Sequence, residues 1–181
     1  MNTPINNLQS RFKQVLLYAP GMLGNDAVNF FLDSFKRQAW LGSRLEPWAK
    51  RRNNKRRPGR AILVDTGRLR RSIRITKVSQ GNVTIGTDVP YAKAHNEGFR
   101  GTVQVKAHKR NKYTKSRVGT GKLTKTGKER TKTISTVSGS SMVKAHTRKV
   151  NIVQRRFMGT SPYFTKQLQR RLSAELMKAM R

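Results

Sequence analysis

The chain has 181 residues, and its 40 Lys and Arg against 8 Asp and Glu give a net charge of +32. The length suits one domain with an extension. The absence of cysteine excludes disulfides, thiol catalysis and a Cys-based zinc site. No run of about 18 apolar residues is present, so we expect no membrane contact. The first residues do not resemble a signal peptide, so we expect assembly in the cytoplasm.

Half of the net charge lies in two short segments, residues 50–60 and 109–132. Both are poor in apolar residues, so we interpret a loop at 49–61 and an arm at 109–141 as basic segments that become ordered against a partner. Charge alone does not distinguish nucleic acid from an acidic protein surface. The residues predicted to contact a partner are Lys50, Arg51, Arg52, Arg56, Arg57, Val103, Val105, Lys109, Arg110, Lys112, Arg117, Lys122 and Val143.

The first predicted elements are two helices. Apolar residues at helical spacing predict a helix over residues 5–17, and Pro20-Gly21 is expected to end it. We therefore treat residues 1–20 as a helical extension and residues 21–181 as a single α+β domain. A second helix is predicted over residues 24–40, with one apolar stripe and Asn25 as its N-cap.

The sequence of the central region predicts short helices and strands. Asp65 or Thr66 is expected to cap a helical turn that runs through Leu69. Residues 72–78 and 83–85 alternate like two strands, with a turn signal at residues 80–82 between them. Residues 90–98 fit a short helix that begins with a proline and ends at a glycine.

Residues 142–146 (MVKAH) repeat part of residues 103–108 (VQVKAH). We call this short repeat the internal echo. We interpret these segments as the two sides of an antiparallel ribbon whose long basic tip is residues 109–141. The chain then predicts a final helix with Ser161 as N-cap and Pro162 in its first turn. Its apolar residues recur at every fourth position from Phe164 to Met180.

The sequence contains no pattern that predicts catalysis, a metal or a cofactor. His108 and His146 would meet if the ribbon pairs, but two histidines without a carboxylate are more simply exposed polar side chains. A nuclease-like cluster of Asp65, Asp88 and Glu97 is a remote alternative, since no two lie in a tight motif. The spacing around residues 119–122 (GTGK) is not that of a phosphate-binding loop.

Four segments in a fixed order carry a resemblance. They are residues 63–73 (LVDTGRLRRSI), 83–87 (VTIGT), 90–98 (PYAKAHNEG) and 156–161 (RFMGTS). This order resembles the phage virion-morphogenesis family, the Mu-like tail-completion and neck proteins of long-tailed bacteriophages. The tryptophan at Trp48 also resembles one that the family has upstream of these motifs. The resemblance covers about residues 24–108 and 142–180; the basic tip and the first helix lie outside it.

The resemblance implies a non-enzymatic subunit that completes or terminates the tail and joins it to the connector. It implies a ring, with six copies favoured over twelve, that contacts connector or neck proteins, the tail tube and, non-specifically, the genomic DNA. Gly67 and Gly86 would allow tight backbone, Tyr91 and Phe157 would pack between helix and sheet, and Asp65 would cap. The family-motif residues are Asp65, Thr66, Gly67, Leu69, Ser72, Gly86, Tyr91, His95, Gly98, Phe157 and Gly159.

The expected fold is α+β. It has N-terminal helices, an antiparallel sheet of about four strands with a short inserted helix, a C-terminal helix packed on the sheet, and a long basic β-ribbon arm. The expected location is the virion, at the head–tail junction. The alternative is a sequence-independent nucleic-acid-binding protein with basic extensions, in the style of ribosomal proteins.

Overall fold

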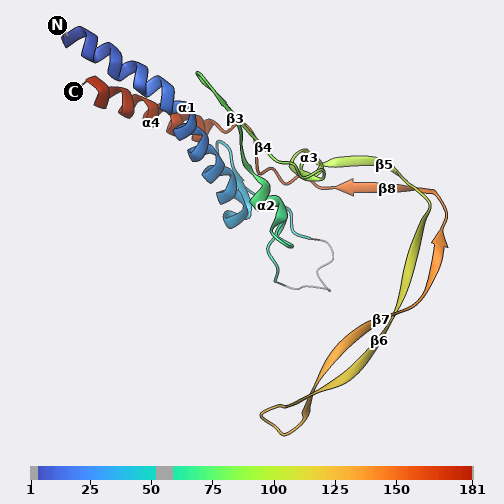
Figure 1. Cartoon of the computed structure of the whole chain (residues 1–181). Coiled ribbons are helices and arrows are strands. Elements are labelled where there is room, and N and C mark those ends of the chain that lie inside the picture. Colours follow the sequence, from blue (N-terminus) through green and yellow to red (C-terminus); the bar gives the residue numbers. More distant parts are fainter. Residues whose placement is uncertain (1–3, 52–58, 181) are drawn as a thin grey trace. The chain divides into compact units, whose positions relative to one another are not determined.

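The computed structural model describes residues 4–51 and 59–180, so the predictions at Arg52, Arg56 and Arg57 lie outside the described residues. The chain divides into two units. The helical body contains the described residues up to Phe99 and from Asn151 onward, and the hairpin unit contains residues 100–150. The chain is mixed helix and strand, which confirms the α+β class (Figure 1).

The elements of the helical body are α1 (Pro4–Arg37), β1 (Ala39–Leu41), β2 (Leu45–Pro47), α2 (Arg68–Ser72), β3 (Arg74–Ser79), β4 (Asn82–Gly86), α3 (Ala92–Glu97) and α4 (Pro162–Met180). The strands leading into, through and out of the hairpin unit are β5 (Phe99–Val105), β6 (His108–Leu123), β7 (Glu129–Val143) and β8 (His146–Ile152). None of the helices in the described residues is long and apolar enough to cross a membrane.

The two predicted N-terminal helices are one helix. The predicted break at Pro20-Gly21 is wrong, because α1 continues through both residues. Proline lacks the N–H that an interior helical residue donates, and this normally ends or bends a helix. Here Val15 and Ala19, just before the proline, are buried against Ala179 of α4. After the expected break, Ala27 and Phe30 are buried in the main core cluster. Packing on both sides of the proline therefore favours continuation of the helix.

The core of the helical body is aromatic. The apolar stripe predicted for residues 24–40 is confirmed at Phe31 and Phe35, which are buried in the main cluster, but the helix ends at Arg37, and the buried Ala39 belongs to β1. Phe30 stacks on Phe164 of α4 with ring centroids 4.4 Å apart. The core therefore joins α1 to the last helix of the chain.

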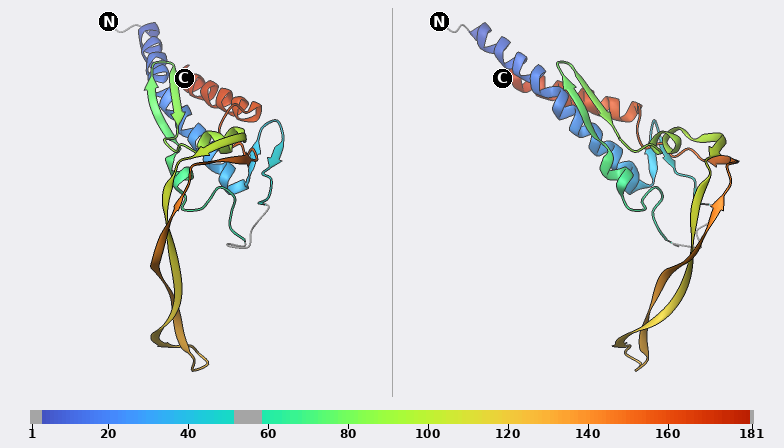
Figure 2. Two further views of the ribbon diagram at one scale, coloured as in Figure 1. Left: turned by 90° about the vertical axis from the view of Figure 1, so that its right-hand side faces the viewer. Right: turned by 45° about the vertical axis from the view of Figure 1, so that its right-hand side comes forward.

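The last helix packs on α1 and not on a sheet, contrary to the prediction. Phe164 meets Phe30 near one end, and Ala179 meets Val15 near the other, so the two helices run antiparallel (Figure 2). Ser161 is the N-cap, as predicted, because its Oγ accepts the N–H of Phe164 at 3.1 Å. The apolar stripe of α4 ends early, since Met180 is exposed.

The predicted sheet of four strands is wrong. The described residues form four separate two-stranded antiparallel ladders, β1–β2, β3–β4, β5–β8 and β6–β7. The hairpin predicted at residues 72–85 is confirmed as β3–β4. It packs on α1 at Gly24, where a Cβ would lie 2.7 Å from Cγ2 of Val83. A helix therefore covers this hairpin in the place where the prediction put further strands.

The hairpin unit is an extended ladder. Strands β6 and β7 pair antiparallel from His108 opposite Val143 to Leu123 opposite Glu129. The register shifts between Lys112 and Tyr113, which leaves Ser138 as an extra residue on β7. None of residues 100–150, all of which the structure describes, is buried. The basic segment 109–141, expected as the long tip of a β-ribbon arm, thus consists mainly of paired strands.

Candidate functional site

Two of the motif segments, residues 90–98 and 156–161, meet within the helical body at a clamp made by Asn96 of α3. Its Oδ1 accepts the backbone N–H groups of Phe157 (2.9 Å) and Met158 (3.0 Å), and its Nδ2 donates to the carbonyl of Met158 (3.1 Å). The carbonyl of His95 accepts the N–H of Arg155 at 2.8 Å. One short helix therefore holds the strand-like segment before α4 as a neighbouring strand would.

The same segment is fixed from its other side by the aromatic core. Phe157 is 1 % exposed and packs on Phe35, with ring centroids 5.3 Å apart. The Nε1 of Trp48 donates to the carbonyl of Arg156 at 2.8 Å, and the guanidinium of Arg156 lies 5.0 Å from the ring centroid of Trp40. The packing role predicted for Phe157 is confirmed, and Trp48 shares it.

Tyr91 does not pack in the core, so that part of the expectation is wrong. Its side chain is exposed and meets the ring of His95 edge to face, with centroids 5.9 Å apart. Burial lowers the pKa of His95, and the positive charge of Arg155 lowers it further. The Nδ1 of His95 is buried and has no hydrogen-bond partner among the described residues. The neutral imidazole is therefore the favoured form.

The turn before α2 differs from the predicted capping. Gly67 is the N-cap residue, with φ of +77°, a conformation that glycine adopts without steric cost. Asp65 forms an ion pair with Arg60 instead of capping. Thr66 accepts the N–H of Arg68 at a long 3.4 Å. Tight backbone at Gly67 is confirmed.

The remaining motif residues have local structural contacts. Leu69 is buried in the core, and Ser72 donates to the carbonyl of Leu69 at 2.8 Å. Gly86 has no unusual φ, but a Cβ there would lie 3.2 Å from Cγ2 of Thr76, so a close approach explains it. Gly98 ends α3 with φ of +81°, and Gly159 has φ of +136°.

The motif residues line a cavity of about 420 Å³ in the helical body. Its other walls come from arginines, including the predicted contact residue Arg51 and the clamp residue Arg155. Burial lowers the pKa of Arg155, and the nearby charge of Arg51 adds to this. Arg155 donates through Nε and Nη2 to the carbonyl of Ala49, at 3.1 and 2.9 Å. The motif junction thus presents a concave surface in which three arginines and one carboxylate lie among apolar side chains.

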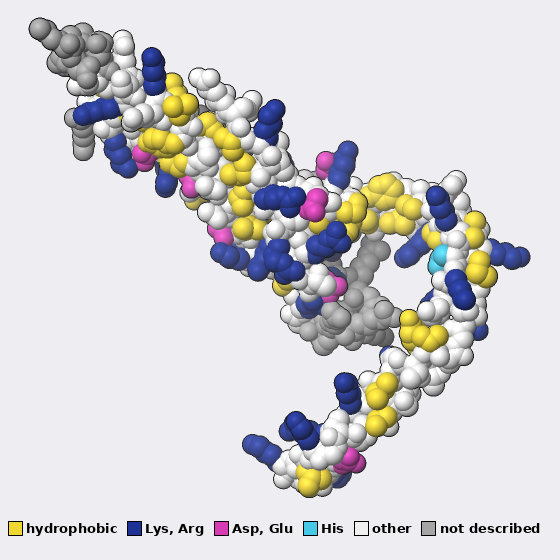
Figure 3. Space-filling view, in the orientation of Figure 1, with side chains coloured by type: hydrophobic (Ala, Val, Ile, Leu, Met, Phe, Trp, Pro, Cys, Tyr) yellow, Lys and Arg dark blue, Asp and Glu magenta, His cyan; other side chains and the backbone are white. Residues whose placement is uncertain are grey.

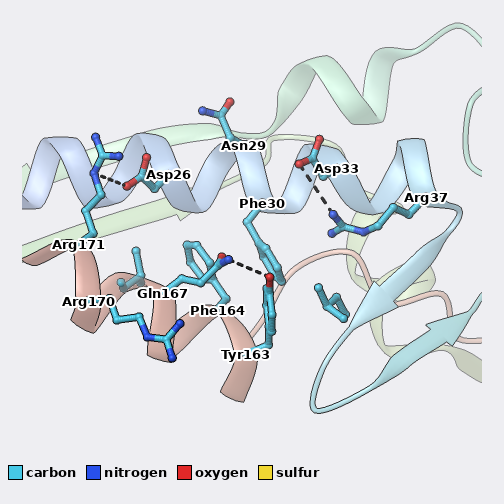
Figure 4. A pocket seen from close by; sticks show the side chains of 12 residues that line it. Asp26, Asn29, Phe30, Asp33, Arg37, Tyr163, Phe164, Gln167, Arg170 and Arg171 are labelled. Carbon is cyan, nitrogen blue, oxygen red and sulfur yellow. Dashed lines mark hydrogen bonds and ion pairs between the residues drawn. The ribbon is translucent and has the colours of Figure 1, made fainter.

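A second concave surface lies between α1 and α4, with a volume of about 680 Å³ (Figure 4). Its carboxylates are neutralised within the body: Asp26 pairs with Arg171 at 3.4 Å, and Asp33 pairs with Arg37 at 3.8 Å. Gln167 donates to the hydroxyl of Tyr163 at 2.9 Å across one turn of α4. This groove is polar at its rim and aromatic at its floor, where Phe30 and Phe164 stack.

The carboxylates of the nuclease alternative do not gather. Asp65 pairs with Arg60, and Asp88 lies 3.7 Å from Arg74. Within residues 4–51 and 59–180, no group of three or more His, Asp and Glu side chains is placed to hold a metal ion.

The predicted contact residues of the hairpin unit are solvent-facing. The six cations of β6 are all exposed, and they lie on both faces of the ladder because neighbouring positions alternate. Lys and Arg side chains are also scattered over the visible face of the helical body, together with several Asp and Glu and with hydrophobic side chains (Figure 3). Lys50 is exposed and Arg51 half-buried. Val103 is exposed, whereas Val105 and Val143 are half-buried.

The internal echo marks a joint in the ribbon. Residues 106–107 and 144–145 belong to no strand, so each side of the ribbon is interrupted at its Lys-Ala pair. The Nδ1 of His108 lies 3.0 Å from the carbonyl of Lys106, and His146 has the same relation to Lys144. Each histidine thus faces its own backbone, and the repeated residues have a repeated local geometry.

Sequence reasoning missed Asn96 and Arg155 as positioning residues. Asn96 lies inside the quoted segment 90–98, but an asparagine in a short polar helix has no distinctive spacing. Its role depends on a segment about sixty residues later in the chain. The only available signal was that both segments belong to one motif series.

These features define an α+β protein whose sequence motifs serve packing and whose charge is presented on its surface. A sequence profile of the phage virion morphogenesis family matches residues 32–177, so the chain belongs to that family. Its role is accordingly in the structure or assembly of a phage virion. Searches of curated proteins and of solved structures gave no match.

Proposed function

We propose that this chain is a ring subunit at the head–tail junction of a tailed phage, where it completes or terminates the tail tube and joins it to the connector. The observation that carries the proposal is the family match over residues 32–177. The motif segments within this range converge on one packed junction around Asn96 and Phe157. A packed junction without a metal-ligand group in the described residues suits a structural subunit.

Six copies per ring are favoured and twelve are the alternative. A closed ring requires each copy to present two different surfaces to its neighbours. The exposed strand β6 and the cavity at the motif junction both carry several cations, so they are not complementary to each other, and each requires a partner surface of opposite charge. We propose that the cations contact acidic regions of neighbouring virion proteins or the DNA that passes through the junction.

The test is inactivation of the gene in the phage, with the wild-type chain supplied in trans as the control. The expected result is filled heads and separate tails that do not join, seen by electron microscopy, and restored joining on complementation. Quantitative mass spectrometry of purified virions should then find about six copies, the number expected for one closed ring. Normal tailed particles that lack the chain would refute the proposal.

The alternative function is sequence-independent nucleic-acid binding. The observation that favours it is the exposed row of cations on β6, whose charge Glu129 alone offsets within β6 and β7. A phosphate-driven binder should lose roughly 10³ to 10⁵ in affinity between 50 and 200 mM salt. Rings that form without nucleic acid and persist at the higher salt concentration would favour the head–tail proposal instead.

A further inference from the structure

The β6–β7 ladder is a two-stranded structure with both edges and both faces open. Every residue of β6 is exposed, and the only partly covered residues of β7 are Ser141 and Val143. Two strands alone are marginally stable in water, because a third strand or a packed layer is needed to bury an apolar face. The ladder therefore has hydrogen-bonding capacity along its edges that another strand can use.

The two edges differ in charge. The cations of β6 are Lys109, Arg110, Lys112, Lys115, Arg117 and Lys122. On β7 the charged residues are Glu129, Arg130 and Lys132 at one end of the strand, and none occurs from Thr133 to Val143. Charged side chains, lysine above all, protect an edge strand against pairing with another chain. The edge of β6 is protected in this way, and the edge of β7 is not.

The best-formed part of the unprotected edge is Thr133–Val137. This stretch pairs in regular register with residues 113–117, and the irregularity at Ser138 follows it. Thr133, Ile134, Thr136 and Val137 are β-branched residues, which favour a strand. Five residues are also an ordinary strand length. A free edge of this composition and length is suited to accept a further strand.

We propose that residues 133–137 of β7 pair antiparallel with the same residues of a second copy, forming a four-stranded sheet in the order β6-β7-β7′-β6′. A second copy fits this edge, because antiparallel pairing of residues 133–137 with themselves places uncharged, mostly β-branched residues opposite one another. Copies that each carry +32 repel one another, so they approach at least cost along such an uncharged segment. Strands are about 4.8 Å apart, which separates the two β6 strands by about 14 Å, beyond the screening length of about 8 Å at physiological salt.

The rival arrangement on the same ladder is β7 against β6′. It would bring the six cations of β6′ directly beside the next ladder and would use the protected edge. A contact of β6 with β6′ would place the cations of both copies side by side and is the least favourable. The twofold contact through β7 is thus the one that the charge distribution favours.

This inference shares with the proposed function the expectation that copies associate, but it does not depend on the place of the chain in a virion. It assigns the contact to one named edge and predicts that the purified chain forms dimers. The contact is isologous, since the same residues of both copies meet across a twofold axis. The test is therefore made on the full-length protein in solution, without phage components.

The first measurement is the dimer dissociation constant, from sedimentation equilibrium between about 1 µM and 1 mM protein. Thr136→Lys adds a cation to β7 near the twofold axis, so like charges face each other in the dimer. Thr114→Lys is the matched control, because Thr114 lies opposite Thr136 and gains the same charge on the same face. Thr136→Lys should raise the dissociation constant about fivefold, the effect of a like-charge pair, and Thr114→Lys less than twofold.

The second measurement is disulfide cross-linking. Because the chain has no cysteine, single cysteines placed at each position from 133 to 137 report only the new contact. Antiparallel pairing across a twofold axis should give efficient cross-linking at one position and a decline on both sides. Mixing this best β7 variant with Ser116→Cys, a β6 variant, should give no cross-link between the two different variants.

Three results would overturn the inference: a wild-type chain that stays monomeric at every concentration, equal effects of Thr136→Lys and Thr114→Lys, or cross-links from β7 to β6′. None of them bears on the head–tail proposal, which stands on the joining of heads to tails. Dimers through β7 in a protein whose loss leaves phage particles intact would leave the inference standing and refute the proposed function.

Discussion

The helical body and the hairpin unit are held together by different interactions, side-chain packing in the body and strand pairing in the hairpin. The body buries aromatic side chains from α1, α4 and the segment between them, with Trp40 and Phe157 at 2 and 1 % exposure. No residue of the hairpin unit is buried, and its long strands β6 and β7 pair with each other. Family-motif residues such as Leu69 and Phe157 stabilise the body, whereas the hairpin presents charge and strand edges. The packed core and the exposed strand edges thus lie in different parts of the sequence.

The largest effect is expected when one apolar side chain is removed from each region and the two losses in the free energy of unfolding are compared. Phe157→Ala should lower the free energy of unfolding by about 3–5 kcal/mol, because it leaves a cavity in an aromatic core. Val137→Ala in β7, where the side chain is 60 % exposed, should change it by less than about 0.5 kcal/mol. Urea unfolding followed by tryptophan fluorescence measures both, since Trp40 and Trp48 lie in the body's core. Equal losses would show that the hairpin is part of the cooperative core.

The second prediction concerns the polar clamp. Asn96→Ala leaves the N–H groups of Phe157 and Met158 without their acceptor and should cost about 2–3 kcal/mol, because buried donors stay unpaired. Lys93→Ala is the control, at an exposed position of the same short helix. It should change the free energy of unfolding by less than about 0.5 kcal/mol. Equal losses for the two variants would contradict the assigned role of Oδ1.

Local features of this fold could be predicted from sequence, because they depend on neighbouring residues. Helical periodicity located α4 and the stripe with Phe31 and Phe35, and turn chemistry located the β3–β4 hairpin and α3. The continuation of α1 through Pro20 depends on packing against α4, which periodicity does not contain. The motif junction could be named from its segments, but the clamp by Asn96 could not, since its partners lie about sixty residues away.

The sheet prediction was wrong for a related reason. Alternating residues indicate that a segment is a strand, but they do not indicate which strand pairs with it. The residue echo correctly drew attention to both sides of one ribbon, and the structure pairs His108 opposite Val143. It did not reveal that β3–β4 packs on α1 through Gly24 and remains a two-stranded ladder. Long-range packing, and not local preference, decided the number of sheets.

The third prediction tests the junction between the clamp segment and α4. Ser161→Ala should cost about 1–2 kcal/mol, because Ser161 caps α4 and also donates to the carbonyl of Leu41 at 2.7 Å. Ser173→Ala is the control, at an exposed position inside the same helix. It should leave stability unchanged or slightly increased, since alanine favours a helix. A loss at Ser173 as large as that at Ser161 would exclude capping as the cause.

The smallest expected effect is a pH dependence that belongs to the body alone. The lowered pKa of half-buried His95 means that the unfolded chain binds a proton more readily than the folded chain. The stabilisation is present above the unfolded pKa of about 6.5 and is lost as pH falls below it. A proton on Nδ1 would place a charged donor where the described residues provide no acceptor, close to the charge of Arg155.

His95→Gln should therefore flatten the dependence of unfolding free energy on pH between about 7.5 and 5.5, whereas His108→Gln, at an exposed ring of the hairpin unit, should leave it unchanged. A flattening by His108→Gln instead would place the titrating group in the hairpin and overturn the division between a self-stabilised body and an outward-facing ladder.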